Sequence, residues 1–285
     1  MRRILVPKTI VGRIDLAGPQ AHHLRDVLRL AAGAIVEVFD ETGTRGRGRI
    51  VSITPVGVSV EVDEIARAGA DGPSLTIAAA VPKGARADWM IEKLSELGVD
   101  TLVPLSTRRS IVLPRGCSKQ DRWRRLAAES AEQSARTGVM RIEPLTELPV
   151  VIERAKAAGS ALWHLSLDED AVPILQLISA LGRGLIGASA GRTAGKPAGY
   201  TREVNQQPAL MVLVGPEGGW STDEADAFRA ARIVPVRLTR TILRVETAAI
   251  AAAVVIQSAL TLTLPAATIL AEALPTASDN PRKSS

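Results

Sequence analysis

Residues 210–224 of this 285-residue chain carry the first residue types that could bind a ligand. They read Leu-Met-Val-Leu-Val-Gly-Pro-Glu-Gly-Gly-Trp-Ser-Thr-Asp-Glu, an apolar strand that enters a glycine turn. Glycines let the backbone approach a ligand and leave amides free to donate. Ser221 and Glu224 have capping-box spacing, which predicts that a helix follows. The spacing fits neither a dinucleotide fingerprint nor a phosphate-binding loop. A tight structural turn is the plain alternative.

Residues 238–247, Leu-Thr-Arg-Thr-Ile-Leu-Arg-Val-Glu-Thr, form the second such segment and join a strand end to an uncharged helix. Arg240, Arg244 and Glu246 would lie where a parallel sheet presents its ligand loops. The alternative is structural: Thr247 caps the helix, and Glu246 pairs with Arg244.

Basic residues concentrate between residues 108 and 125. The window holds one acid, Asp121, and seven basic residues: Arg108, Arg109, Arg115, Lys119, Arg122, Arg124 and Arg125. The whole chain has a net charge of only +5, so this local excess makes a polyphosphate partner an equal alternative to a solvated helix and loop face. The helix predicted from Ser118 also carries Gln133 and Arg136, which extends a polar stripe able to follow a nucleic-acid backbone.

The elements that must position these residues change character near residue 73. Before it, short β-like runs at 4–6, 35–39, 48–53 and 56–62 predict a small β-barrel, interrupted by one helix over 20–30. After it, apolar runs at 75–81, 102–105, 161–167, 210–214 and 233–238 alternate with helices near 85–98, 119–136, 147–158, 170–181, 221–231 and 247–262. This alternation predicts a parallel sheet covered on both faces, with ligand sites at the carboxyl ends of its strands.

These patterns predict an α/β protein with a small barrel domain over residues 1–70 and a larger domain over 74–265, joined by a linker at 66–73. A glycine-rich stretch at 182–208 is expected to be a flexible insertion, and 275–285 a disordered tail.

Composition excludes several classes of protein. Hydrophobic residues make up 46% of the chain, enough for a proper core. One cysteine cannot form an intramolecular disulfide, and three histidines with it give no convincing metal site. No signal peptide precedes the first strand, so we expect a cytoplasmic enzyme or binding protein without a metal. An aromatic content of 2% disfavours recognition of single strands by stacked bases.

The uncharged segment 247–271 raises the question of a membrane span. It is rich in alanine and threonine, and Pro265 interrupts it. The helical part before the proline would be ~24 Å long, short of the ~30 Å hydrocarbon core. We therefore expect a buried core helix and no membrane association.

Five segments together resemble the RsmE family of 16S ribosomal RNA uridine methyltransferases, which belong to the SPOUT class. They are Gly215-Pro-Glu-Gly-Gly219, Ile242-Leu-Arg-Val-Glu-Thr-Ala248, Lys83-Gly-x-Arg86 with Lys93-x-x-Glu-Leu-Gly98, Glu132-Gln-Ser134 with Arg136, and His23-Leu-x-x-Val-Leu-Arg29. They occur in the family's order across residues 1–265. The resemblance implies a PUA-like barrel, a trefoil-knotted parallel sheet, a homodimer and S-adenosyl-L-methionine as methyl donor. It also implies that the last helix packs against a partner subunit through Ala248, Ala249 and Ala251 to Ala253.

The resemblance also implies roles for residues. The cofactor-binding residues are expected to be Val214, Gly215, Pro216, Glu217, Gly218, Gly219, Leu238, Thr241, Ile242 and Leu243. Contacts with RNA are expected from His23, Arg29, Lys83, Arg86, Arg109, Arg125, Gln133 and Arg136. The implied reaction methylates N3 of one uridine in the decoding region of the small ribosomal subunit. Arg244 is expected to favour the imide anion, and Glu246 to orient Arg244 or accept a proton through water.

Two other functions remain open at this point. The chain could be a ribosome-assembly protein that binds ribosomal RNA without catalysis, in which case it would not bind S-adenosylmethionine. It could also be a nucleotide-dependent metabolic enzyme with a doubly wound sheet, but the missing glycine fingerprint argues against this class.

Overall fold

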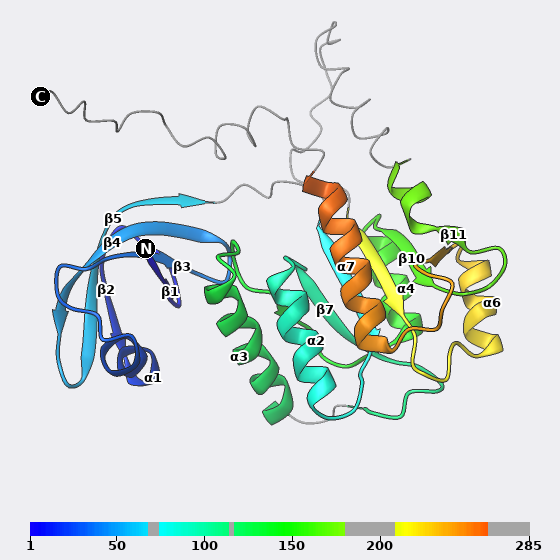
Figure 1. The fold of residues 1–285 in the computed structure, drawn as a ribbon, viewed down its shortest axis with the longest axis horizontal. Helices are drawn as coiled ribbons and strands as arrows, with labels where there is room; N and C mark the ends of the chain where they lie inside the picture. Colours follow the sequence, from blue (N-terminus) through cyan, green and yellow to red (C-terminus); the bar gives the residue numbers. More distant parts are fainter. Residues whose placement is uncertain (68–73, 114–116, 180–208, 262–285) are drawn as a thin grey trace, which may run out of the picture.

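The computed structural model describes residues 1–67, 74–113, 117–179 and 209–261, which form two separate sheets (Figure 1). The predicted insertion at 182–208, the tail at 275–285 and most of the linker at 66–73 lie outside these residues. The predicted α/β class, with a small β domain before a larger parallel sheet, is confirmed.

The N-terminal sheet has five strands in the order β1-β3-β4-β5-β2. Its strands are β1 (Arg2–Leu5), β2 (Gly12–Ala17), β3 (Ile35–Phe39), β4 (Thr44–Ile53) and β5 (Gly57–Arg67). Valines and isoleucines that alternate along these strands build the core, with Val36, Val38, Ile50 and Val60 fully buried. The single helix predicted over 20–30 is instead α1 (Gly18–His22) followed by a π-helix, η1 (His23–Val27).

Strand β4 begins four residues earlier than predicted because its glycines belong to the sheet. It reads Thr-Arg-Gly-Arg-Gly-Arg, with the arginines exposed and the glycines buried. A Cβ atom at Gly46 or Gly48 would lie 2.7 Å from the carbonyl oxygen of Glu64 or Glu61 on β5. Only glycine permits this close approach of the two strands.

The C-terminal sheet has eight strands, ordered β11-β13-β10-β12-β6-β7-β8, with β9 beside β7. All its strand pairs are parallel. The strands are β6 (Leu75–Ala80), β7 (Thr101–Ser106), β8 (Arg141–Ile142), β9 (Thr146–Glu147), β10 (Ala161–Leu165), β11 (Val172–Pro173), β12 (Leu210–Val214) and β13 (Val234–Arg237). The five longer strands match the predicted runs to within a few residues, whereas the two-residue strands were not predicted.

Helices cover both faces of this sheet, as the continuous apolar strands predicted. The helices include α2 (Ala85–Glu96), α3 (Cys117–Gln133), α4 (Leu148–Ala157), α6 (Thr222–Ala230) and α7 (Val245–Thr261) (Figure 1). Residues 174–179 are helical as well, within the helix predicted near 170–181. Ile77 and Val212 point into the core shared with α2, α3 and α7, whereas their neighbours Ala78 and Leu213 point into the core shared with α4 and α6. The alternation along each strand therefore places both faces against apolar helix surfaces.

The helix boundaries confirm one of the predicted start and stop residues, and show that two others were wrong. Gly98 ends α2 in a left-handed conformation with φ of +80°, as a helix-stop glycine should. Helix α3 begins at Cys117, so Ser118 is inside the helix and does not precede it. Helix α7 begins at Val245, so Thr247 is likewise not its cap.

The alanines of α7 pack mainly within the chain. Ala249, Ala252 and Ala253 are fully buried in the core shared with α2 and β6. The expectation that these three alanines contact a partner subunit is therefore wrong, because their small side chains already allow α7 to approach α2. Within the described residues, no helix is long and apolar enough to cross a membrane.

The two domains meet where β1 touches the end of α3. The Arg3 guanidinium donates to the backbone carbonyls of Ala131 and Arg136, at 3.3 and 3.0 Å, and lies over the Phe39 ring. The Leu5 amide donates to the Glu132 carboxylate at 2.8 Å. These contacts fix the barrel domain against the helix that carries most of the basic window.

Candidate cofactor and RNA site

One cavity of about 870 Å³ lies at the carboxyl ends of β10, β12 and β13. Its volume is within the range of small-molecule sites. Every residue expected to bind a cofactor lines it: Val214, Gly215, Pro216, Glu217, Gly218, Gly219, Leu238, Thr241, Ile242 and Leu243. The two glycine- and arginine-bearing segments thus converge on one cavity, as the parallel topology requires.

The first wall of the cavity is held by the start of α6. Ser221 accepts from the Glu224 amide at 3.3 Å, and the Glu224 carboxylate accepts from the Ser221 amide at 2.8 Å. This is the predicted capping box. It fixes the point at which the glycine turn becomes a helix, and so fixes the conformation of the turn.

An aromatic cluster supports the same wall. The rings of Trp220 and Phe228 meet edge to face with centroids 4.9 Å apart, and His164 stacks on Phe228 at 4.4 Å. A Cβ atom at Gly215 would lie 2.9 Å from the Trp220 ring. Gly215 is therefore needed for the indole to pack under the turn.

His164 is a buried, neutral member of this cluster. Burial lowers the pKa of its imidazole to about 4, partly opposed by Asp168 and Asp170. Its Nδ1 atom is buried and has no hydrogen-bond partner among the described residues. Sequence reasoning missed His164, Trp220 and Phe228 as residues lining the cavity. For His164 a sequence signal did exist, because it belongs to the apolar run at 161–167, and ligand sites were expected at the carboxyl ends of these strands.

The second wall is the loop that leads into α7. Two charged residues around the start of α7, Arg244 and Glu246, are not placed as expected. Neither Arg244 nor Glu246 lines the cavity. Arg244 is exposed, whereas Glu246 is buried, with 5% of its side chain exposed. Arg86 lies 3.5 Å from the Glu246 carboxylate and 3.8 Å from that of Glu217. Both the structural alternative that pairs Glu246 with Arg244 and the expectation that Glu246 orients Arg244 are therefore wrong in this structure.

Two of the arginines expected to contact RNA, Arg109 and Arg136, donate hydrogen bonds to backbone carbonyls instead. Arg109 donates to the Gly218 carbonyl at 2.7 Å. Arg136 donates to the carbonyls of Ser95 and Val99, at 3.0 and 2.9 Å, and burial lowers the pKa of its guanidinium. Arg136 therefore caps the end of α2. To contact a phosphate, its guanidinium would have to leave both carbonyl acceptors and its half-buried position. The expected phosphate contact does not fit this placement.

The other expected RNA contacts are divided between the two domains. Lys83, Arg125 and Gln133 are exposed on the larger domain. His23 and Arg29 are exposed at the two ends of one segment of the barrel domain, and Arg29 has a left-handed backbone with φ of +49°. Burial raises the pKa of the carboxyl of Glu132, the residue before Gln133, and His23 lies near enough to oppose part of this rise.

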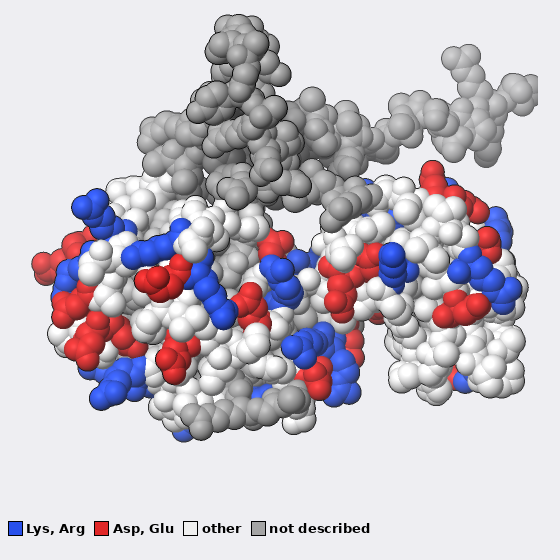
Figure 2. Space-filling view, turned by 180° about the vertical axis from the view of Figure 1, so that it is seen from behind, with Lys and Arg blue, Asp and Glu red and all other residues white. Residues whose placement is uncertain are grey.

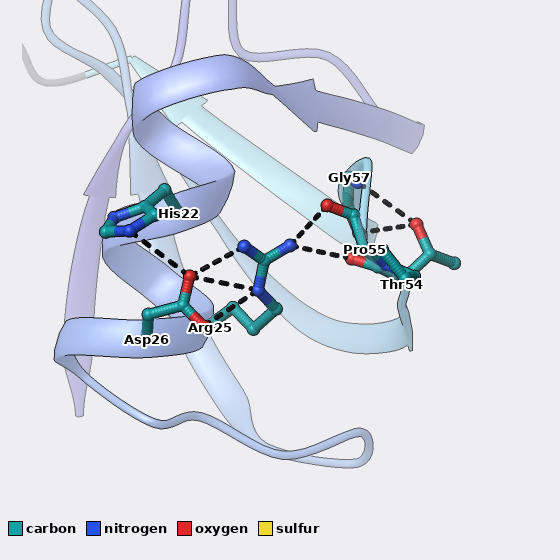
Figure 3. A network of polar contacts seen from close by, with 6 residues as sticks. All are labelled: His22, Arg25, Asp26, Thr54, Pro55 and Gly57. Atoms are coloured by element: carbon teal, nitrogen blue, oxygen red, sulfur yellow. Dashed lines mark hydrogen bonds and ion pairs between the residues drawn. The ribbon is translucent and has the colours of Figure 1, made fainter.

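A local network fixes that segment of the barrel domain. Arg25 bridges the Asp26 carboxylate and the carbonyls of Thr54 and Pro55, and His22 lies 3.4 Å from Asp26 (Figure 3). The π-helix is therefore tied to the β4–β5 turn.

Charges of both signs are interspersed over the face shown in Figure 2, on both domains. The exposed basic residues of α3, Arg122, Arg124 and Arg125, come from the basic window of the sequence. Asp88 and Asp121 lie within 2.9 Å of Arg122 and Arg124, respectively. No ion pair of Arg125 is seen among the described residues.

Two family models match the sequence of this chain, one over each of the two domains. Residues 70–257 match the family described as RNA methyltransferase domain, and residues 16–63 match the RNA methyltransferase PUA domain. The chain is 27% identical to the ribosomal RNA small subunit methyltransferase E of Synechocystis over 248 residues, 87% of this chain and 74% of that protein. It is also 27% identical to the Bacillus subtilis protein of that name, over 82% of this chain and 85% of the relative.

Solved structures show the same fold. The Neisseria gonorrhoeae ribosomal RNA small subunit methyltransferase E, bound to S-adenosyl methionine, superposes with a TM-score of 0.70 at 24% identity, over 90% of this chain and 97% of that one. A probable rRNA-methyltransferase from Porphyromonas gingivalis gives a TM-score of 0.69 at 25% identity, over 92% of this chain and 99% of that one.

The fold and the cavity thus define a SPOUT-class protein with a PUA-like domain. The chain belongs to the RNA methyltransferase family, since the family's domain covers about two thirds of it, and it is similar to the ribosomal RNA small subunit methyltransferase E proteins, the RsmE group.

Proposed function

We propose that this protein transfers a methyl group from S-adenosylmethionine to N3 of one uridine in the decoding region of 16S ribosomal RNA. The observation that carries the proposal is the convergence of the Gly215–Gly219 and Leu238–Leu243 loops on one cavity at the carboxyl edge of the sheet. The named relatives act on small-subunit ribosomal RNA, which supports this substrate. Such a substrate implies a cytoplasmic location.

The cavity fits S-adenosylmethionine in size and in the kind of wall it offers. A backbone without side chains at Gly215, Gly218 and Gly219 provides amide and carbonyl groups at close range. Leu238, Ile242 and Leu243 supply an apolar wall suited to an adenine ring and the methylene groups of the methionine chain. When bound, the cofactor supplies an activated methyl group on its sulfonium sulfur.

The residues of the chain contribute positioning and charge. Arg244 follows the cavity-lining Leu243 directly and is exposed, so its guanidinium is free to approach a uracil ring at the cavity mouth. A cation there favours loss of the imide proton from N3 to solvent water. Glu246 is buried against Arg86, so we assign it to holding Arg86 at this edge. Precise placement of the two reactants would supply most of the acceleration.

We propose that RNA contacts come from Lys83, Arg86, Arg125 and Gln133 in the larger domain and from His23 and Arg29 in the barrel domain. Phosphate contacts of this kind make affinity fall steeply with salt. We also propose that the protein acts as a homodimer. Trp89 on α2 and Val254 on α7 remain exposed on adjacent helices, at 47% and 41%, and provide apolar surface for a second copy.

The test is to incubate the purified protein with methyl-labelled S-adenosylmethionine and small ribosomal subunits that lack the modification. Nuclease digestion and mass spectrometry then locate the label. We expect one labelled nucleoside, N3-methyluridine, at one position. Absence of label on uridine, while calorimetry shows intact cofactor binding, would contradict the proposed reaction. Absence of cofactor binding would favour the non-catalytic ribosome-assembly protein.

A further inference from the structure

The loop between β7 and α3 lies directly against the loop that lines the cavity. The loop begins with a compact turn, in which the Thr107 amide donates to Ser110 Oγ at 3.0 Å and the Ser110 amide donates to the Thr107 carbonyl at 3.2 Å. This turn presents Arg108 and Arg109 toward the cavity loop and α6. The turn is thus pre-shaped by its own hydrogen bonds before it contacts anything else.

Glu224 joins this turn to the start of α6. One of its carboxylate oxygens, Oε2, accepts from the Ser221 amide and completes the capping box. The other, Oε1, accepts from the backbone amide of Arg108 at 2.8 Å. A capping box needs only the first of these bonds. The second connects the β7–α3 loop to the first turn of α6, between residues that are 116 positions apart in the sequence.

Arg109 makes the second connection. Its Nη1 donates to the Gly218 carbonyl at 2.7 Å, a charge-assisted hydrogen bond to a residue that lines the cavity. A Cβ atom at Gly218 would lie 3.4 Å from both Cβ and Cδ of Arg109, so the aliphatic part of the arginine packs on the glycine backbone. The hydrogen bond and the packed aliphatic chain of Arg109 thus both act on the backbone of Gly218.

We propose that Arg109 and Glu224 are positioning residues that lock the Gly215–Gly219 loop into its cofactor-binding shape from the side opposite the cavity. Neither residue lines the cavity, so neither is expected to touch the cofactor. Each removes conformational freedom that the glycine-rich loop would otherwise lose when the cofactor binds. Arg108 and Arg109 belong to the basic window 108–125. Their contacts with Glu224 and Gly218 therefore also connect the proposed RNA-binding surface to the cofactor site.

The inference rests on the proposed cofactor site, and cofactor affinity tests both. Calorimetry with S-adenosylmethionine on the purified full chain should show that Arg109→Ala and Glu224→Ala each raise Kd by about five-fold or more, as loss of a partly exposed charge-assisted bond implies. Arg109→Lys should recover part of the affinity, since an ammonium can still donate to the Gly218 carbonyl. Steady-state kinetics should show a raised KM for the cofactor with kcat nearly unchanged at saturation.

Three controls separate the possible outcomes. Arg154→Ala, which removes an exposed arginine of α4 paired with Glu143, should leave Kd unchanged. Ser221→Ala weakens the capping box but keeps the Arg108 bond, so it should affect Kd less than Glu224→Ala. Ala248→Phe places a ring in the cavity wall and should abolish binding.

If Ala248→Phe abolishes binding while Arg109→Ala and Glu224→Ala retain the wild-type Kd, the positioning role is wrong and the cofactor site stands. If Ala248→Phe folds, as thermal unfolding would show, and still binds normally, the proposed cofactor site itself is wrong. A lowered melting temperature in Arg109→Ala, with unchanged Kd and KM, would assign Arg109 a purely structural role and overturn the inference.

Discussion

The guanidinium of Arg86 lies 3.5 Å from the carboxylate of Glu246, and this pair joins the first turn of α2 to the first turn of α7. The two residues are 160 positions apart in the sequence. Their contact brings the Lys83-Gly-x-Arg86 segment to the same sheet edge as the second wall of the cavity. The carboxylate is buried and its second oxygen has no partner among the described residues, so it depends on Arg86 for compensation.

Removing Arg86 should therefore leave an uncompensated buried charge. We expect Arg86→Ala to lower the free energy of unfolding by about 1–2 kcal/mol, the cost of leaving a buried carboxylate without its partly exposed counter-ion. Adding Glu246→Gln should restore part of the loss, because the neutral amide needs no counter-charge. Urea unfolding of both single variants and the double variant measures this coupling. Strictly additive effects would show that the two side chains do not interact.

Gly215 and Gly218 should respond differently to alanine. The added methyl group at Gly215 meets the Trp220 ring at 2.9 Å, whereas at Gly218 it meets Arg109 at 3.4 Å. The ring is held by Phe228 and cannot retreat easily, whereas the arginine side chain can shift. We expect Gly215→Ala to weaken S-adenosylmethionine binding by about ten-fold or more and Gly218→Ala by less, since overpacking costs roughly 1–3 kcal/mol. Equal affinities in a calorimetric titration would contradict this packing argument.

His164 should make the protein sensitive to acid. Its folded pKa of about 4 is below the unfolded value near 6.5, so between these values the unfolded state binds more protons. Its contribution to stability is complete above pH 6.5 and is lost as the pH falls toward 4, by up to about 3 kcal/mol.

His164→Phe keeps a ring stacked on Phe228 and removes the titrating group. Thermal unfolding between pH 4 and pH 7.5 should show a flatter pH dependence in this variant than in the wild type. An unchanged slope in acid would mean that other groups cause the loss of stability.

Glu132 should produce the opposite pH dependence at the domain contact. Burial raises the pKa of its carboxyl above the ordinary value, with the Leu5 amide and His23 partly opposing the shift. The folded state therefore binds more protons, and stability falls as the pH rises from the unfolded pKa through the folded one.

Glu132→Gln keeps an oxygen for the Leu5 amide and avoids the buried charge. We expect a higher melting temperature than wild type at pH 7 and a difference that shrinks toward pH 4. A variant less stable than wild type at pH 7 would show that the ionised carboxylate stabilises the domain contact.

Much of the fold follows from patterns that are local in the sequence. Apolar runs separated by amphipathic segments predicted the parallel sheet and the faces its helices cover. Parallel topology then predicted that the loops after β12 and β13 share one edge, and the structure places Gly215 and Leu243 around the same cavity. The Ser221–Glu224 capping box was visible because it depends on residues three apart.

Pairings across long sequence separations could not be predicted in this way. Arg86, Arg109 and Arg136 all appeared as free cations in the sequence, yet they bind Glu246, the Gly218 carbonyl and the Ser95 carbonyl, respectively. Which acceptor each arginine meets depends on how loops pack in three dimensions. The alanines of α7 present a related case, because small residues suit close packing within one chain as well as between two.

We propose that the loops 214–219 and 238–243 together form the binding site for S-adenosylmethionine. Amide hydrogen exchange of the full chain, with and without saturating S-adenosylmethionine, tests it most directly, because backbone amides report ligand contact residue by residue. We predict slower exchange in both loops on addition of the cofactor, with little change in β2 to β5. Unchanged exchange in these two loops, with protection elsewhere in the chain, would show that the cofactor binds at another site.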